Sequence, residues 1–316
     1  MNLTTDYTPD GFDIVTAGLI FTIGNLGVIF NGSVIYCFLV DKENRAAFQI
    51  LCTTRALFNF LILLLAFLLD FFPAVIRGSS LFSLHVESII IVFCNGIYMM
   101  NQHGAIAIAV NRLICLYLPL RYNTIFSRKN TLVLMFVYGV YRFSKLFNEI
   151  YSTPEGCHTL FMVKSLAWEY TCESIYSGVL FFTFSTNFFV VAVNMLSFFK
   201  IYRFYKAKRS QVFSRNHDKK MKKNMILFIQ TFLQDGFYSI DMLFSFQLAS
   251  LYDTRLWSLI SSTLVWECVH MTDGLIMMMF NDKFSFIWKR ICKGRFMKND
   301  STSQPSNTVP KTSLKK

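Results

Sequence analysis

Polar and charged side chains recur at helical spacing inside long apolar stretches of the sequence. Spacings of three and four residues place each set on one face of a helix. In lipid, such faces must point at other helices or at a water-filled cavity. Bonding between helices explains any single residue well, but four converging stripes predict the polar interior of a receptor or transporter. The stripes are Arg55, Asn59 and Asp70; Asn95, Tyr98, Gln102 and Arg112; Gln230, Gln234, Tyr238 and Asp241; and Ser262, Trp266, His270 and Asp273.

The apolar stretches that carry these stripes are long enough to cross a bilayer. The chain is 53% hydrophobic and 16% charged, against about 25% charged in ordinary soluble proteins. A helix needs about 20 apolar residues to cross a hydrocarbon core of about 30 Å. We therefore expect an all-α membrane protein with a seven-transmembrane helix bundle. The predicted spans lie near residues 14–40, 48–72, 86–110, 131–150, 175–199, 224–248 and 257–280.

The distribution of basic residues predicts how the bundle is oriented. If all seven segments cross the membrane, 25 of the 31 Lys and Arg residues fall on the same side of it. This count requires that the fourth segment crosses, although it contains Arg142 and Lys145. Cytoplasmic loops carry the excess of Lys and Arg, so we expect an extracellular amino terminus and a cytoplasmic carboxyl terminus. The net charge of +12 then reflects topology and attraction to anionic lipid, and does not indicate a nucleic-acid partner.

The segments outside the spans suggest local roles. Residues 1–13 would form an extracellular segment, with a glycosylation sequon at Asn2. Residues 14–298 form the bundle domain, and residues 299–316 are expected to be a disordered cytoplasmic tail. Bulky apolar and basic residues alternate over 284–296, which is typical of a short amphipathic helix on the inner membrane face. Cys292 in that helix is a candidate palmitoylation site.

Three motifs carry a resemblance to a known receptor family. The end of the third span reads AVNRLICLYLPLRY over 109–122, and the seventh reads WECVHMTDGLIMMMFN over 266–281. The sixth span contains FIQTFLQD over 228–235 and YSIDMLF over 238–244. Together, over residues 15–295, they resemble the nematode serpentine chemoreceptors of class x (Srx), which are rhodopsin-like G-protein-coupled receptors.

The resemblance implies roles for individual residues. Asn111 and Arg112, with Pro119, Leu120 and Tyr122 in the following loop, match the segment through which such receptors couple to a heterotrimeric G protein. Asn111 stands where the family pattern has an ionisable Asp, so proton-linked release there is excluded.

Three further positions match the interhelical polar network of the wider receptor class. Asn31 and Asn59 match the Asn and Asp of the first two spans, and Asp273 matches the Asn of the seventh. The Pro and Tyr that usually follow that seventh-span position are absent, so the helix-kink arguments of the class do not carry over.

A ligand pocket is expected in the outer half of the bundle. No Asp occurs at the level of Cys94 in the third span, which argues against a biogenic amine; a small amphipathic molecule or a peptide would both suit the site. The expected pocket residues are Cys94, Asn95, Tyr98, Tyr238, Asp241, Trp266, Glu267 and His270.

The eight cysteines show no metal-ligand spacing, and no cofactor is expected. Cys157 and Cys172 lie in the same extracellular loop, an oxidising setting, so a bridge between them is favoured. A bridge from that loop to Cys94 stays open, although Cys94 lies well inside the third helix.

A G-protein-coupled chemosensory receptor in the plasma membrane, with a sensory cilium as a candidate location, is the favoured function. The alternative is a secondary transporter that uses the intramembrane charges, although the sequence has no internal repeat or pair of broken helices. No nucleophile motif or metal-ligand spacing of histidines indicates an enzyme. The ligand, the G-protein subtype and the oligomeric state are not encoded in any motif.

Overall fold

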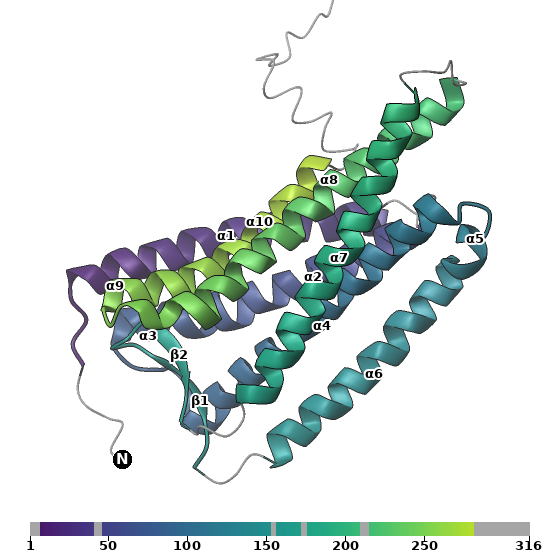
Figure 1. Ribbon diagram of the computed structural model, residues 1–316. Helices are drawn as coiled ribbons and strands as arrows, with labels where there is room; N and C mark the ends of the chain where they lie inside the picture. Colours follow the sequence, from purple (N-terminus) through teal and green to yellow (C-terminus); the bar gives the residue numbers. More distant parts are fainter. Residues whose placement is uncertain (1–6, 41–45, 153–155, 172–175, 209–214, 281–316) are drawn as a thin grey trace, which may run out of the picture.

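The computed structural model describes residues 7–40, 46–152, 156–171, 176–208 and 215–280, and within these ranges the chain forms seven long helical rods. Three rods are single helices: α1 (Gly11–Val40), α4 (Leu84–Tyr117) and α7 (Tyr176–Lys208). The fourth rod is α6 (Arg128–Ser152), preceded by the one-turn helix α5 (Tyr122–Ile125). These rods and the three described next cover each of the seven predicted segments (Figure 1).

The second, sixth and seventh rods each contain a π-helical segment. The second is α2 (Ala47–Ile62), the π segment Leu63–Phe71 and α3 (Phe72–Arg77). The sixth is α8 (Arg215–Leu243), the π segment Phe244–Leu248 and a 3₁₀ turn, Ala249–Leu251. The seventh is α9 (Arg255–Ser258), the π segment Leu259–Leu264 and α10 (Val265–Phe280). All three π-helical segments lie in the same half of the bundle, where they change which side chains face inward.

Four helices in the described part of the chain are long and apolar enough to cross a membrane. They are Gly11–Val40, Ala47–Arg77, Leu84–Tyr117 and Phe181–Phe204. The fourth rod, α6, falls short because Arg142 and Lys145 interrupt its apolar run. Outward-facing aromatic residues such as Phe136, Phe181 and Phe188 are 72–77% exposed, as expected for helices whose outer faces meet lipid tails.

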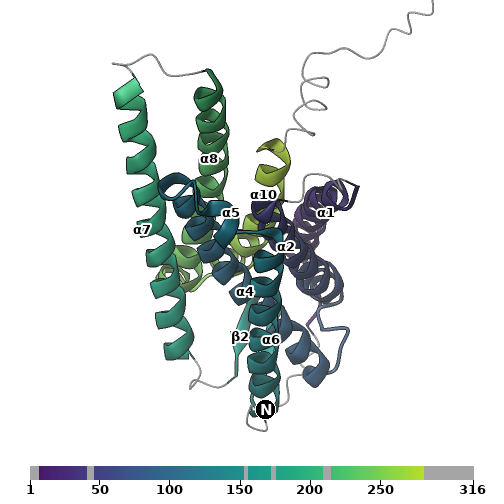
Figure 2. The ribbon, with the colours of Figure 1, turned by 90° about the vertical axis from the view of Figure 1, so that its right-hand side faces the viewer.

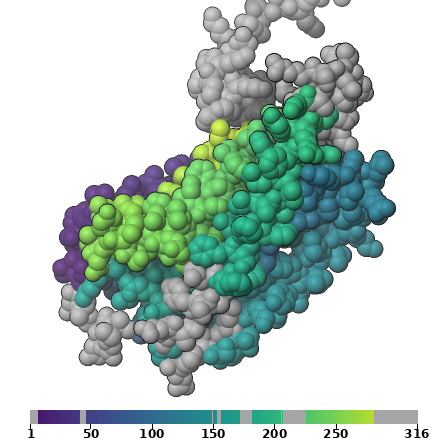
Figure 3. All heavy atoms as spheres, viewed as in Figure 1, coloured from purple at the N-terminus to yellow at the C-terminus, as the bar shows by residue number. Residues whose placement is uncertain are grey.

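The rods pack around α4, which touches α2, α6, α7 and α8. The helix α1 packs along α10 and the second rod, while α6 lies on the opposite side of the molecule (Figures 1 and 2). Beside α8, α7 forms part of the surface seen in Figure 3. Close packing of α1 depends on Gly27, where a Cβ would lie 2.5 Å from Leu63 Cδ1 and 3.2 Å from Met271 Cα.

A two-stranded antiparallel hairpin covers one end of the bundle. Strands β1 (Thr159–Met162) and β2 (Ala167–Tyr170) pair with Phe161 opposite Trp168. The Phe161 N–H donates to Glu87 Oε1 of α4 at 2.8 Å, and its ring stacks on Phe71 at 4.1 Å between centroids. This end is called the hairpin end, and the opposite end, where α4 finishes, the Arg112 end. Sequence patterns did not predict the hairpin.

Candidate functional site

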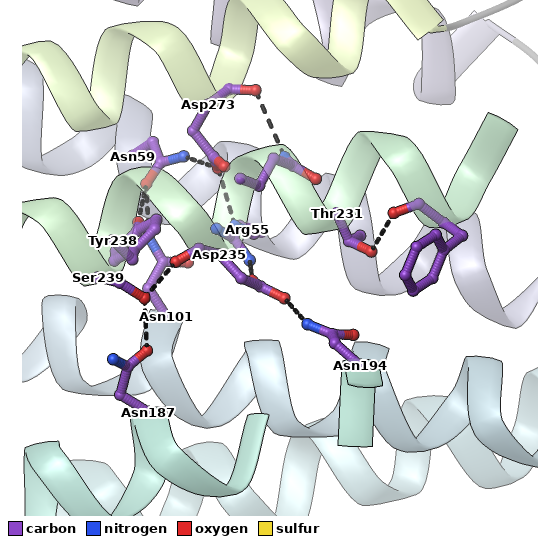
Figure 4. A network of polar contacts seen from close by, with 12 residues as sticks. Arg55, Asn59, Asn101, Asn187, Asn194, Thr231, Asp235, Tyr238, Ser239 and Asp273 are labelled. Carbon is purple, nitrogen blue, oxygen red and sulfur yellow. Dashed lines mark hydrogen bonds and ion pairs between the residues drawn. The ribbon is translucent and has the colours of Figure 1, made fainter. Parts of the chain in front are cut away.

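Three charged side chains meet in the middle of the bundle, where they join the second, sixth and seventh rods (Figure 4). The Arg55 guanidinium donates from Nε to Asp273 at 2.9 Å and from Nη1 to Asp235 at 3.2 Å. Its Cζ atom also lies 4.6 Å from the centre of the Tyr238 ring. All three charged residues are at most 5% exposed. A buried cation paired with two carboxylates avoids the large cost of an isolated charge in a low-dielectric interior.

Polar side chains extend this ion triad, Arg55 with Asp235 and Asp273, across the bundle. Asn59 donates to Asp273 at 2.5 Å, and its side-chain oxygen accepts from Tyr238 at 3.1 Å and contacts His270 Nδ1 at 2.8 Å. Asn101 of α4 donates to both Asn59 and Tyr238. On the other side, Asn194 of α7 donates to Asp235 at 2.9 Å. Five of the seven rods therefore contribute to one connected polar network.

The local sequence explains why these residues meet. Arg55 and Asn59 are one turn apart on α2, as are Asp235 and Tyr238 on α8, and His270 and Asp273 on α10. Each helix thus offers one member of the triad and one further hydrogen-bonding side chain on the same face. The expected convergence of polar stripes occurs in part, since Asp70, Asn95 and Arg112 lie away from the network. Asp70 lies inside the π segment Leu63–Phe71, about 22 Å along the rod from Arg55 at about 1.5 Å per residue. Its carboxylate has no hydrogen-bond partner among the described residues.

Sequence reasoning missed Asp235, Asn101 and Asn194 as members of this network. Asp235 and Asn101 each adjoin a residue that was assigned to the stripe, Gln234 and Gln102. Both residues of each pair are buried. A signal for Asp235 was present, because it lies three residues before Tyr238 on the same helix face.

The predicted interhelical set of Asn31, Asn59 and Asp273 comes together in part. Asn59 contacts Asp273 directly, whereas Asn31 donates to the His270 backbone oxygen at 3.0 Å. Asn31 also packs against Gly274, where a Cβ would lie 2.6 Å from Asn31 Nδ2. The seventh rod is therefore held from both sides at this level.

Five of the predicted pocket residues form an aromatic and acidic group on the hairpin side of the triad. Tyr98 donates to Asp241 at 2.6 Å, and its ring lies 5.9 Å from the rings of both Tyr238 and His270. Trp266 lies 6.4 Å from Tyr98 and 6.0 Å from His270. Through Tyr238, this group is continuous with the ion triad.

The other three predicted pocket residues take no part in these contacts within the described part of the chain. Cys94 is a fully buried free cysteine within the apolar core. Asn95 lies within 3.3 Å of the Tyr170 hydroxyl on strand β2. Glu267 faces the first helix, where its Oε1 would lie 3.1 Å from a Cβ at Gly24. The Glu267 carboxylate thus lies against α1.

Comparison with known sequences identifies the class of protein to which this bundle belongs. The model of the family described as serpentine type 7TM GPCR chemoreceptor Srx matches residues 21–281. The chain belongs to this family. It is therefore a multi-pass membrane protein with a seven-transmembrane bundle, of a family of chemoreceptors and not of enzymes. No curated protein matches the sequence.

The Asn-Arg motif of this Srx chain lies at the Arg112 end. Arg112 is 6% exposed and its guanidinium lies 4.8 Å from the Phe48 ring, yet none of its three nitrogens has a hydrogen-bond partner among the described residues. Asn111 and Tyr122 are within hydrogen-bonding distance at 3.4 Å. Pro119 lies in the exposed turn after α4, and Leu120 is 95% exposed.

At the hairpin end of the Srx bundle, Arg255 joins three segments. Its guanidinium forms ion pairs with Asp13 and Asp10 and donates to the backbone oxygens of Val163 and Lys164. Tyr7 donates to Asp13 at 2.7 Å. These contacts hold together the first turn of α1 with the residues before it, the hairpin turn and the start of the seventh rod. Sequence reasoning assigned no role to Arg255.

The predicted glycosylation site Asn2 and the predicted palmitoylation site Cys292 lie outside the described residues. The same holds for Cys172 and for the predicted amphipathic helix 284–296. Cys157 is disulfide-bonded, and Cys94, the alternative partner for the loop, is free. A bridge between Cys157 and Cys172 stays a prediction.

Proposed function

We propose that this chain is a chemosensory receptor of the plasma membrane, with a sensory cilium as a candidate location. Its hairpin end would face the outside of the cell and its Arg112 end the cytosol. A small molecule or peptide would bind in the outer half of the bundle and cause activation of a heterotrimeric G protein. Family membership supports the receptor class, and the basic residues near the Arg112 end support this orientation.

The observation that carries the proposal is the unpartnered guanidinium of Arg112. A buried Arg normally has several hydrogen-bond partners, because five N–H donors without acceptors are costly. Arg112 instead lies beneath the Phe48 ring, with no acceptor among the described residues. If the Arg112 end opened, these donors would become available to carbonyl oxygens of a docking G-protein α subunit. Asn111 beside it cannot ionise, so this step would not depend on a proton.

The polar interior offers a physical link between the two ends. The Tyr98–Asp241 pair lies on the hairpin side, and the Tyr98 ring touches Tyr238, whose hydroxyl belongs to the network around Arg55. A ligand that altered the Tyr98–Asp241 contact would therefore act on helices that also carry the ion triad. Packed interiors respond to such changes by switching between discrete arrangements.

Expression in cells that lack other receptors of this family tests the proposal. A panel of radiolabelled small molecules and short peptides would be scored for second-messenger responses, with and without a co-expressed G-protein α subunit, and for uptake. We expect responses that require the α subunit, without accumulation of the active compound. Uptake that proceeds equally without the α subunit would contradict the proposal and favour a secondary transporter.

A further inference from the structure

A small pocket opens at the hairpin end, apart from the aromatic group around Tyr98. Its volume is about 170 Å³, and strand β2 and the sixth and seventh rods form its walls. Half of its lining residues belong to two of the π-helical segments, Phe244–Leu248 and Leu259–Leu264. Such widened turns commonly occur at functional sites. The lining residues are Ala167, Trp168, Ser245, Phe246, Ala249, Ser258, Ser261 and Ser262.

The chemistry of this serine pocket is polar but uncharged. Four of its eight lining residues are serines, two are aromatic and two are alanines. Ser261 is fully buried, and its hydroxyl has no hydrogen-bond partner in the described part of the chain. A buried hydroxyl without a partner is costly in the free protein. It is therefore a donor and acceptor that a bound molecule could satisfy.

Size and charge restrict what the pocket can hold. An engineered cavity of about 150 Å³ binds benzene, so a pocket of this volume suits one small ring with a short substituent and excludes a peptide. None of its described lining residues is ionisable, so a charged ligand would lose water without gaining a counter-ion. The rings of Trp168 and Phe246 offer apolar surface to such a molecule.

The pocket also contacts the interior. Ser245 donates to Asp241 Oδ1 at 3.3 Å, and the other oxygen of that carboxylate accepts from Tyr98. The Trp168 ring lies 6.2 Å from Trp266. A molecule in the pocket would thus touch residues in direct contact with the Tyr98 and Trp266 group, from which the polar network leads to Arg55.

We propose that the serine pocket is the ligand site of this receptor, and that its ligand is a small neutral molecule with one aromatic or cyclic apolar part and a hydroxyl or carbonyl group. The Ser261 hydroxyl bonds the polar group of the ligand, and the apolar part lies against Trp168 and Phe246. This assignment rests on the proposed receptor function. It narrows the ligand from the wider range of small molecules and peptides to one chemical class.

Binding to the full-length chain in lipid nanodiscs tests the assignment. Benzyl alcohol, benzoate and benzylammonium share one ring and differ in charge, and saturation-transfer NMR measures their affinity, with empty nanodiscs as the blank for lipid partitioning. We expect saturable binding of benzyl alcohol, with both ions at least tenfold weaker. Equal affinity for an ion, or no saturable binding of benzyl alcohol, would overturn the proposal.

Variants locate the site. Ala249→Leu should fill the pocket and abolish benzyl alcohol binding. Ser261→Ala, which removes only a hydroxyl that has no partner, should keep the fold and weaken binding by about fivefold, as expected for one hydrogen bond. Ser185→Ala is the matched control, because that exposed hydroxyl bonds its own helix at Phe181. If Ala249→Leu does not fold, Ser261→Ala decides: affinity equal to that of the wild type overturns the site.

A separate readout distinguishes this inference from the receptor function. Guanine-nucleotide exchange on G-protein α subunits is measured with the same nanodiscs. Pocket binding with no exchange on any α subunit would overturn the proposed function while retaining the pocket as a binding site. Exchange evoked by a peptide or an ion, unaffected by Ala249→Leu, would retain the receptor function and overturn the assignment of the pocket.

Discussion

The Arg55 guanidinium is bonded to Asp273 at 2.9 Å, in a contact that ties the second rod to the seventh in the middle of the bundle. Asp235 of the sixth rod completes the ion triad at 3.2 Å. Each ion is buried, so the three stabilise the bundle only as a set. This relationship predicts that single and combined substitutions behave very differently.

Arg55→Met should destabilise the bundle by about 3–5 kcal/mol, because it leaves two buried carboxylates without a cation. Adding Asp235→Asn and Asp273→Asn to the same chain should recover much of that loss. Thermal unfolding of the purified chain in detergent measures both effects. Arg77→Met, a change at an exposed Arg of the same rod, is the control and should have little effect. A triple variant no more stable than Arg55→Met would refute the triad account.

Gly274→Ala should destabilise the contact between α1 and α10 by about 1–3 kcal/mol, as overpacking of an interior usually does. The added methyl group would meet the Asn31 side chain at 2.6 Å. In an Asn31→Ala background the same change should cost much less, because the obstructing amide is gone. Gly139→Ala, where a Cβ has open space, should be neutral or slightly stabilising in thermal unfolding. Equal costs of Gly274→Ala in both backgrounds would count against this packing.

Tyr7 should ionise only at strongly alkaline pH. Partial burial and, after it, the hydrogen bond to Asp13 together raise the pKa of its phenol to about 12. Because the folded-state pKa lies above the unfolded value of about 10, this contribution to stability is complete below pH 10 and is lost as the pH rises through 12. The difference in ultraviolet absorbance between the wild type and Tyr7→Phe during titration isolates this one phenol. A difference midpoint near 10 would contradict the contact.

Cys157 should be linked to Cys172, and Cys94 should remain a thiol. Cys157 is disulfide-bonded and Cys94 is free and fully buried. Mass spectrometry of the protein digested without reductant should therefore find the two loop cysteines in one linked peptide. Cys94 should react with an alkylating agent only after denaturation. A linked peptide that contains Cys94 would require a different arrangement of the hairpin.

The sequence predicts this fold well where spacing alone decides the outcome. Seven apolar segments and the one-turn spacing of Arg55 with Asn59, or His270 with Asp273, follow from helix geometry and from the cost of polar groups in lipid. The π-helical segments do not follow, because an inserted residue in a helix leaves no local pattern and yet rotates everything beyond it. Asp70 lies apart from Arg55 for a different reason, because fifteen residues of one rod separate the two by about 22 Å.

The interior site was predictable in kind but not in every member. Helical spacing identifies a face only to within a residue or so, and it therefore favours Gln234 and Gln102 over their neighbours Asp235 and Asn101. The sequence predicts Glu267 in the pocket with Trp266 and His270, whereas in the structure it faces α1 at Gly24. The serine pocket needs the hairpin, and strand pairing between such short segments is determined by packing on Phe71 and Glu87 rather than by local sequence.

The central claim is that the Arg112 end of this receptor activates a G protein. Its most direct test is the rate of guanine-nucleotide exchange that the purified chain in nanodiscs evokes in G-protein α subunits. We predict that Arg112→Ala abolishes this exchange while expression and thermal stability are retained, because Arg112 makes no hydrogen bond to the described protein. The control is Lys129→Ala, at an exposed basic residue at the start of α6 near the same end. This variant should evoke exchange in the α subunits at the wild-type rate. Exchange by Arg112→Ala at the wild-type rate would contradict the account.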